Sequence, residues 1–313
     1  MKKLIVLLMA VAMVAAVSAQ VTTSVSLYGD VTVIDQDGNS VFTRYGNGYD
    51  LWTLKASDKD GKYGFSITDQ NILDDSGLVV RDWNFWWKGQ YTKVILGKLR
   101  NADFRYTLPY WSGNTKFGGT DRITGYGVLI EAPFKNGMLL GVNLPISETA
   151  TNLWTVVKKA DLGFKYNIKD FGGIFALMNF EIPTNASVLN AGFNYNASKC
   201  FNLVGITKMQ FGAADTYQAA LGAKYTGVKD LTVWAEGAYK YVRGDNTYSL
   251  WAQADYSLTE KLTATVGGAV KSDGHDVYAK LGYDYGNGLS SEVGFGHDTA
   301  FYAAAKLYYS VAF

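Results

Sequence analysis

From Ser24 onward, apolar and polar side chains alternate at every second position, in units of about ten residues that are each followed by a turn. Three segments show the pattern most clearly: residues 217–225, 248–256 and 301–309. In each segment, aromatic residues stand at both ends of an apolar face filled by Ala and Leu, and polar residues occupy most of the other face. Because successive side chains of a β-strand point to opposite sides, the pattern predicts many strands with one apolar and one polar face.

The aromatic positions indicate what the apolar face contacts. Eight residues at about 3.3 Å each extend about 26 Å, enough for most of a tilted membrane crossing. Aromatic rings at both ends of such a stripe are typical of the two membrane interfaces. The alternative is a soluble β-sandwich, which has no reason to place rings around a centre of Ala. The other face carries mid-strand charges that require a wet lumen, at Glu236, Asp255, Lys165, Lys224 and Lys280. We therefore expect an all-β fold, a transmembrane antiparallel up-and-down β-barrel.

The connections between the units are short and long in alternation, as in outer-membrane barrels with short periplasmic turns and longer external loops. The segments number 18 in order, and boundary uncertainty leaves a range of 16–18 strands. An even number returns both ends of the barrel to the same side. No helix is expected after the first twenty residues. The short turns lie at 58–61, 135–137, 258–260 and 285–288, and the longer links at 35–48, 70–79, 99–124 and 145–157.

The first residues have the layout of a secretory signal peptide. Lys2 and Lys3 precede an apolar run over residues 4–17, and the small residues up to Ala19 suit a signal peptidase. The apolar run is shorter than the about 20 residues of a spanning helix. The sequence therefore predicts a signal peptide over 1–19 and a single outer-membrane β-barrel domain over 20–313.

Composition excludes several other classes. Cys200 is the only cysteine, so an internal disulfide cannot form. A formal net charge of +1 argues against a nucleic-acid-binding protein. The segment 35–39 lacks the spacing of a calcium loop. His275 and His297 are expected at different loops or strand ends, so neither a metal site nor any other cofactor is predicted.

Three stretches resemble the general bacterial outer-membrane porin family of Gram-negative bacteria. The segment Ser24-Val25-Ser26-Leu27-Tyr28-Gly29 is similar to the first strand of many such porins. The longest loop follows the fifth predicted strand, where the family places its constriction loop, and contains Phe117-Gly118-Gly119-Thr120-Asp121. The chain ends in Phe313, as barrels of the outer membrane commonly do. The chain resembles a divergent member, because Lys116 stands where the family often has an acidic residue and sixteen strands are usual in the family.

The predicted strand number and the resemblance together imply a porin, a water-filled channel for passive diffusion of ions and small hydrophilic solutes, and not an enzyme. The loop would narrow the channel with its charged residues, which are Arg100, Asp103, Arg105, Lys116, Asp121 and Arg122. Candidates on the lumen wall are Asp30, Lys55, Asp82 and Lys88, and the resemblance implies a basic cluster opposite the loop in which Lys55 is the best-placed member.

The resemblance also implies a homotrimer in outer-membrane lipid with both termini in the periplasm. The barrel-assembly machinery would read the last strand through Tyr309, Val311 and Phe313. Three alternatives stay open at this point. Trp86, on the face of Asp82 and Lys88, suggests a sugar-preferring pore. His297 beside Asp298 is the one fragment that suggests a hydrolase at the rim, and the third alternative is an adhesive or structural surface barrel.

Overall fold

The computed structural model describes residues 21–34, 41–43, 51–70, 79–108, 120–146, 152–212 and 216–312. The predicted signal peptide and Phe313 lie outside these ranges. Every strand described belongs to one antiparallel sheet of 19 strands. The strands are β1 (Val21–Ile34), β2 (Val41–Thr43), β3 (Leu51–Asp58), β4 (Tyr63–Gln70), β5 (Val79–Lys88), β6 (Lys93–Asn101), β7 (Ile123–Pro133), β8 (Met138–Pro145), β9 (Asp161–Ile168), β10 (Gly172–Asn179), β11 (Val188–Ser198), β12 (Phe201–Gln210), β13 (Thr216–Val228), β14 (Leu231–Val242), β15 (Asp245–Ser257), β16 (Leu262–Lys271), β17 (Gly274–Gly286), β18 (Leu289–His297) and β19 (Phe301–Ala312).

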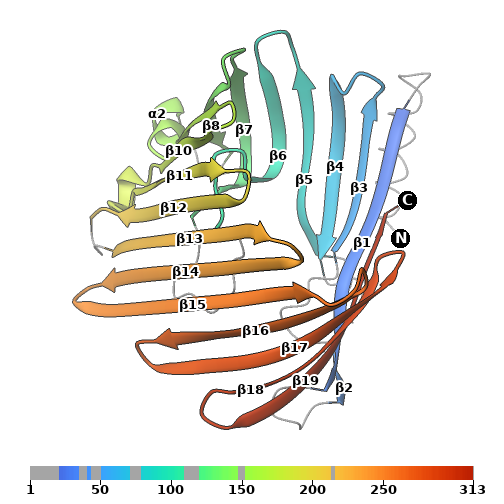
Figure 1. Cartoon of the computed structure of the whole chain (residues 1–313). Helices are drawn as coiled ribbons and strands as arrows, with labels where there is room; N and C mark the ends of the chain where they lie inside the picture. Colours follow the sequence, from blue (N-terminus) through green and yellow to red (C-terminus); the bar gives the residue numbers. More distant parts are fainter. Residues whose placement is uncertain are drawn as a thin grey trace.

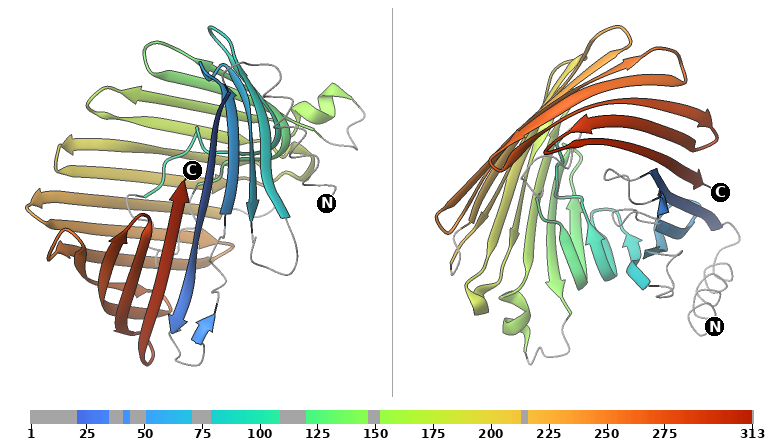
Figure 2. Two further views of the ribbon diagram at one scale, coloured as in Figure 1. Left: turned by 90° about the vertical axis from the view of Figure 1, so that its right-hand side faces the viewer. Right: turned by 90° about the horizontal axis from the view of Figure 1, so that it is seen from below.

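The sheet closes on itself through its first strand. Ser26 of β1 is paired with Thr53 of β3 on one side and with Ala312 of β19 on the other. All other long strands pair with their neighbours in sequence order, as Figures 1 and 2 show around the curved sheet. Apart from the three-residue β2, which pairs with the end of β1, the strands form a ring of 18. The predicted up-and-down barrel and the count of 18 strands are thus confirmed.

The alternation of side chains along the strands separates two faces. On β15, Leu250 is 62% exposed on the outside, whereas its neighbour Trp251 is 3% exposed on the inside. The predicted stripe on β13 behaves in the same way: Tyr217, Leu221 and Tyr225 are exposed on the outer face, whereas Ala220 is buried on the inside. The inward charge Glu236 is almost fully buried among neighbouring wall residues, whereas the sequence predicted it to face water.

The connections at the two ends of the sheet differ in length. We call the end at which β1 begins and β19 finishes the terminal end, and the opposite end the loop end. Terminal-end turns are short, and at 287–288 the residues Asn287 and Gly288 have φ of 53° and 79°, the left-handed values that a tight hairpin turn requires. The long connections over 35–50, 71–78, 102–122 and 146–160 all lie at the loop end. The predicted alternation of short and long connections is therefore confirmed for the first four loop-end connections, whereas later ones such as 243–244 and 272–273 are short.

Two short helical segments were not expected from the sequence. The helix α2 (Leu153–Val157) follows β8, and η1 (Ile182–Thr184) is a single 3₁₀ turn after β10. Asn152 caps α2 by accepting a hydrogen bond from the backbone N–H of Thr155 at 3.0 Å. A helix of five residues is too short to produce a recognisable period in the sequence. In the described part of the chain, no helix is long and apolar enough to cross a membrane.

The separation of faces makes a prediction about stability in a bilayer. Leu221→Arg places a charge on the outer face and is expected to lower the free energy of unfolding by about 2–4 kcal/mol. The control Gln218→Arg puts the same group on the inner face of the same strand, near Lys208 and Lys240, and should cost under about 1 kcal/mol. Urea unfolding in phospholipid vesicles measures both changes. Equal costs for the two variants would contradict the assignment of the faces.

Candidate functional site

The described parts of the connection between β6 and β7, residues 102–108 and 120–122, turn into the barrel and lie on the inner wall. The Phe104 side chain is 1% exposed and covers Gly141 of β8 and Gly163 of β9, where a Cβ atom at either glycine would overlap its ring. Further along, Leu108 packs against inward residues of four strands. These are Phe175, Val204, Ile206, Ala220 and Ala238. The loop therefore packs against the wall at two places: Phe104 covers the two glycines, and Leu108 lies in the apolar cluster.

Polar contacts fix the same loop at its middle and at its end. The hydroxyl of Tyr106 lies 3.1 Å from Oδ1 of Asn167, and the Tyr106 ring stands edge-on to Phe175 with 5.2 Å between centroids. The burial of Tyr106 raises the pKa of its hydroxyl. Asp121 is held twice, by Nζ of Lys208 at 2.7 Å and through its backbone N–H, which donates to Oδ1 of Asn190 at 2.8 Å.

The start of the loop is attached to the wall by a cluster of charges. Nζ of Lys93 lies 2.9 Å from Oε2 of Glu131 and 3.7 Å from Oδ2 of Asp103. The side-chain amide of Asn101 donates to Oδ2 of Asp103 at 2.7 Å. Burial acts to raise the pKa of Asp103, but side-chain hydrogen bonding with Glu131 and Asn101 and the charge of Lys93 outweigh it and lower that pKa. Asp103 is therefore charged at neutral pH.

A first cavity of about 520 Å³ lies beside the loop and is bordered by Arg100, Arg105 and Arg122. Three carboxylates also border it, but each already has a partner. Asp121 contacts Lys208, Glu181 lies 3.0 Å from Lys159, and Asp161 accepts hydrogen bonds from Asn143 and Asn179, both at 2.8 Å. The lining thus carries four basic side chains, because Lys159 joins the three arginines, against three carboxylates, so that positive charge is in excess in the cavity.

The arginines are close enough to influence one another. Burial lowers the pKa of Arg105 to about 10, with further lowering by the charges of Arg122 and Arg100 and an opposing effect of Asp121. Guanidinium groups that repel each other in a partly dry site are stabilised by an anion placed between them. The arrangement is thus suited to receive a carboxylate or a phosphate from the lumen.

A second cavity of about 470 Å³ lies between the start of the loop and the wall formed by β3 to β6. Lys55 and Trp86 face each other in it, with Nζ of Lys55 5.5 Å from the centroid of the ring. Arg100 borders this cavity as well as the first one. The remaining lining residues include Ser57, Ser66, Asn84, Lys93, Asn101 and Asp103.

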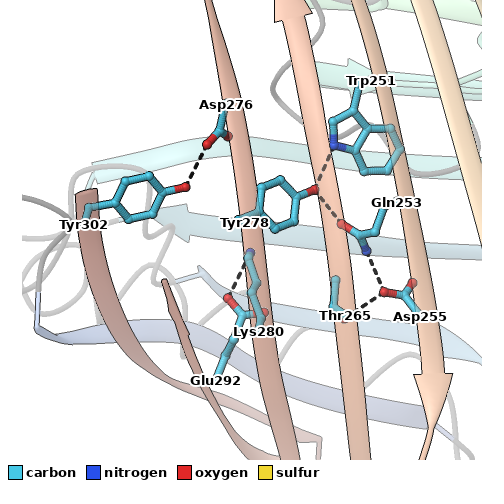
Figure 3. A network of polar contacts seen from close by, with 9 residues as sticks. All are labelled: Trp251, Gln253, Asp255, Thr265, Asp276, Tyr278, Lys280, Glu292 and Tyr302. Atoms are coloured by element: carbon cyan, nitrogen blue, oxygen red, sulfur yellow. Dashed lines mark hydrogen bonds and ion pairs between the residues drawn. The ribbon is translucent and has the colours of Figure 1, made fainter. Parts of the chain in front are cut away.

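The wall of β14 to β19 carries a network of hydrogen bonds between inward side chains (Figure 3). The indole N–H of Trp251 donates to the hydroxyl of Tyr278 at 2.8 Å, and that hydroxyl donates to Oε1 of Gln253 at 2.7 Å. Asp255 receives hydrogen bonds from the side chains of Gln253, Thr265 and Trp234. The network continues through Tyr302 with Asp276, 2.8 Å, and Lys280 with Glu292, 3.1 Å. This part of the wall satisfies its own polar groups.

The structure brings together most of the predicted loop residues. Arg100, Arg105, Asp121 and Arg122 border the first cavity, and Asp103 borders the second. Lys116 and the segment 117–119 lie outside the described residues. Their role in restricting a channel stays a prediction.

The predicted wall residues are dispersed. Lys55 lines the second cavity, whereas Asp82 is bound to Arg81 at 2.6 Å, and Lys88 is the exposed last residue of β5. Asp30 lies in β1, paired with Tyr308. At the other end of the chain, Tyr309 and Val311 lie in β19 and pair with Gly29 and Leu27 of β1. Phe313 is not among the described residues.

Sequence reasoning missed several partners of the loop, above all Lys93, Glu131, Asn190 and Lys208. Their inward positions follow from the alternation, but nothing in the sequence indicates which wall residue meets which loop residue. The two histidines are also closer than expected, since their rings stack with 5.5 Å between centroids on the outer face of β17 and β18. In the part of the chain that is described, no three His, Cys, Asp or Glu side chains lie close enough together to hold a metal ion.

Comparison with solved structures places this architecture among outer-membrane porins. OprD of Pseudomonas aeruginosa aligns with a TM-score of 0.60 and 12% identity, over 95% of this chain and 96% of OprD. OpdK of the same species, solved with vanillate, aligns with a TM-score of 0.58 and 10% identity, over 95% and 99% of the two chains. OccAB3 of Acinetobacter baumannii gives a TM-score of 0.58 and 11% identity over 94% and 99%.

No protein-family model and no curated protein matches the amino-acid sequence. The chain therefore has the fold of Gram-negative outer-membrane porins along nearly its whole length, at a sequence identity that establishes the fold alone. The structural neighbours are channel proteins. The resemblance to porins drawn from the sequence is confirmed at the level of the fold.

The buried position of the Phe104 ring leads to a prediction about the stability of the loop. Phe104→Ala removes a fully buried ring and is expected to lower the free energy of unfolding by about 3–5 kcal/mol and to increase amide hydrogen exchange in 102–108. Gly163→Ala should also lower the free energy of unfolding and increase exchange in 102–108, because its methyl group would displace the Phe104 ring. Gly237→Ala is the control, since its Cβ would meet only the flexible end of Leu250 at 3.2 Å. Unchanged exchange in 102–108 for Phe104→Ala would show that the ring does not hold the loop.

Proposed function

We propose that this chain is an outer-membrane channel through which small hydrophilic solutes diffuse passively, with a preference for anions. A closed ring of 18 strands is wide enough to leave an aqueous interior, whereas about 8 strands leave only room for side chains. The loop occupies part of this interior and brings Arg100, Arg105 and Arg122 to its edge. This arginine cluster, whose neighbouring carboxylates are already engaged, is the observation that carries the anion preference.

The comparison with solved structures also supports a preference for anions. OpdK was solved with vanillate, which is a carboxylate. An anion entering the first cavity would exchange its hydration for charge-assisted hydrogen bonds from guanidinium groups, while a cation would meet repulsion. The remaining parts of the proposal follow the porin fold. They are a signal peptide over 1–19, outer-membrane lipid around the barrel, a homotrimer, and recognition of Tyr309, Val311 and Phe313 by the assembly machinery.

Reversal potentials in a planar bilayer under a KCl gradient test the channel and its preference together. The folded protein is expected to give stable conductance steps and to pass chloride more readily than potassium. Arg105→Gln combined with Arg122→Gln should reduce the chloride-to-potassium permeability ratio severalfold, because the fixed positive charge at the loop is removed. Lys135→Gln, in a terminal-end turn, is the control that removes a positive charge elsewhere.

The pH dependence of the selectivity has a definite sign. A cation whose pKa is lowered to about 10 stays charged at neutral pH and loses its charge as the pH rises through 10. The chloride preference should therefore be constant between about pH 5 and 8 and fall above about pH 9, less steeply in the double variant. A folded barrel that gives no conductance steps contradicts the proposed channel, and cation selectivity contradicts only the anion preference.

The orientation in the membrane can be tested with the single cysteine. Cys200 is exposed in the terminal-end turn between β11 and β12, which we propose to face the periplasm. A membrane-impermeant maleimide of a size excluded by porins should leave Cys200 unlabelled in intact cells and label it after the outer membrane is permeabilised. Ser272→Cys in a Cys200→Ser background places the thiol in the exposed loop-end turn between β16 and β17, and it should react in intact cells. The reverse pattern of labelling would contradict the orientation.

A further inference from the structure

The second cavity has a wall whose composition is set by strand register. Across β3, β4 and β5, one inward row consists of Lys55, Ser66 and Asn84. The next row toward the terminal end consists of Ser57, Gly64 and Trp86, and continues into Ile95 of β6. The first row presents an ammonium, a hydroxyl and a carboxamide side by side. The second presents an aromatic ring over a glycine.

Gly64 determines where the ring of Trp86 lies. A Cβ atom at Gly64 would overlap the six-membered part of the indole, so the ring covers this glycine directly. The ring also packs against the buried cluster that contains Ile95, Leu99 and Phe104. The indole is thus fixed between the wall and the start of the loop while it borders the cavity. A ring held in this way loses little conformational entropy when a ligand packs against it.

Several polar groups that border the cavity, away from the charged cluster of Lys93 and Asp103, have no partner within the described part of the protein. Among the residues that the structure describes, the side chains of Ser57, Ser66 and Asn84 and the indole N–H of Trp86 have no hydrogen-bond partner. The wall of β14 to β19 differs in this respect, because its indole, hydroxyl, amide and carboxylate groups bind one another (Figure 3). Free donors and acceptors beside a fixed ring are what a polar ligand requires.

We propose that this cavity binds a single sugar ring, with Trp86 as the stacking surface. Sugars combine an apolar face of C–H groups, which packs on an aromatic ring, with hydroxyl groups that both donate and accept hydrogen bonds. Ser57, Ser66 and Asn84 supply both functions, and Lys55 donates to hydroxyl oxygens or to the carboxylate of a sugar acid. A volume of about 470 Å³ is within the usual range for small-molecule sites.

Charge and position connect this site to the rest of the lumen. Lys93 and Asp103 neutralise each other in part, so Lys55 and Arg100 give the cavity a positive field that tolerates neutral and acidic sugars. Arg100 borders both cavities and would contact a solute that moves from one to the other. The inference rests on the proposed channel only in that the solute reaches the cavity from the lumen.

Calorimetric titration of the folded barrel with D-glucose and D-glucuronate tests the site without reference to conductance. The protein is kept in lauryldimethylamine oxide, because detergents with sugar head groups would compete. We expect at least one of the two sugars to bind, and Trp86→Ala to weaken that binding by about tenfold. Trp86→Phe should retain part of the affinity. Trp87→Ala, which removes the adjacent tryptophan from the outer face, should leave it unchanged.

The outcomes separate the sugar site from the channel. Binding by neither sugar, or equal binding by the wild-type protein and Trp86→Ala, overturns the sugar site even when conductance steps are present. Sugar binding that depends on Trp86 in a barrel without conductance supports the site and contradicts the proposed channel. If Trp86→Ala does not fold, Asn84→Ala and Ser66→Ala test the sugar site instead. Each removes one free polar group and should weaken sugar binding by about three- to fivefold, and unchanged binding in both overturns the site.

Discussion

The closure of the backbone hydrogen-bond ladder at β1 is the constraint on which the rest of the structure depends. A strand edge in hydrocarbon would leave its N–H and C=O groups without partners, and no water is available there to satisfy them. Because Ser26 pairs with both Thr53 and Ala312, the ladder has no free edge between β3 and β19 at this point. Only then can the outer face present apolar side chains such as Leu250 to lipid while the inner face encloses polar groups. The interior in which the loop is seated exists because the ladder closes.

Alternation made most of the fold predictable, because it is a local property. Leu250 and Trp251 are adjacent in sequence and both are apolar, yet their positions within a regular period assign them to opposite faces. Turn chemistry such as Asn287-Gly288 marks the ends of strands, and the number of units gives the number of strands. The five-residue α2 escaped this reasoning because its capping residue Asn152 lies outside any apolar period.

The site was predictable only in part, because its contacts join residues that are distant in sequence. Loop length indicated that the segment around Arg105 and Asp121 has a function, and family resemblance indicated that it folds inward. The contact between Asp121 and Lys208 spans 87 residues, and the fit of Phe104 onto Gly141 and Gly163 depends on the register of β8 and β9, which sets these two glycines opposite each other. A list of the charged residues in a loop cannot distinguish a carboxylate that forms an ion pair with the wall from one that does not. That distinction determines the sign of the electrostatic field in the first cavity.

The two cavities show how one loop can divide the interior into chemically different regions. Lys208 and Lys159 engage the carboxylates Asp121 and Glu181, and this leaves the arginine side of the first cavity with an excess of positive charge. At the start of the loop, Lys93 lies between Glu131 and Asp103, so their charges partly cancel, and Lys55 stands among hydroxyl and amide groups of the wall. Arg100 stands where the two regions meet. A solute with both a charge and hydroxyl groups would find complementary partners in the two cavities in succession. An apolar solute would find few, because the apolar loop side chains Phe104 and Leu108 are buried against the wall.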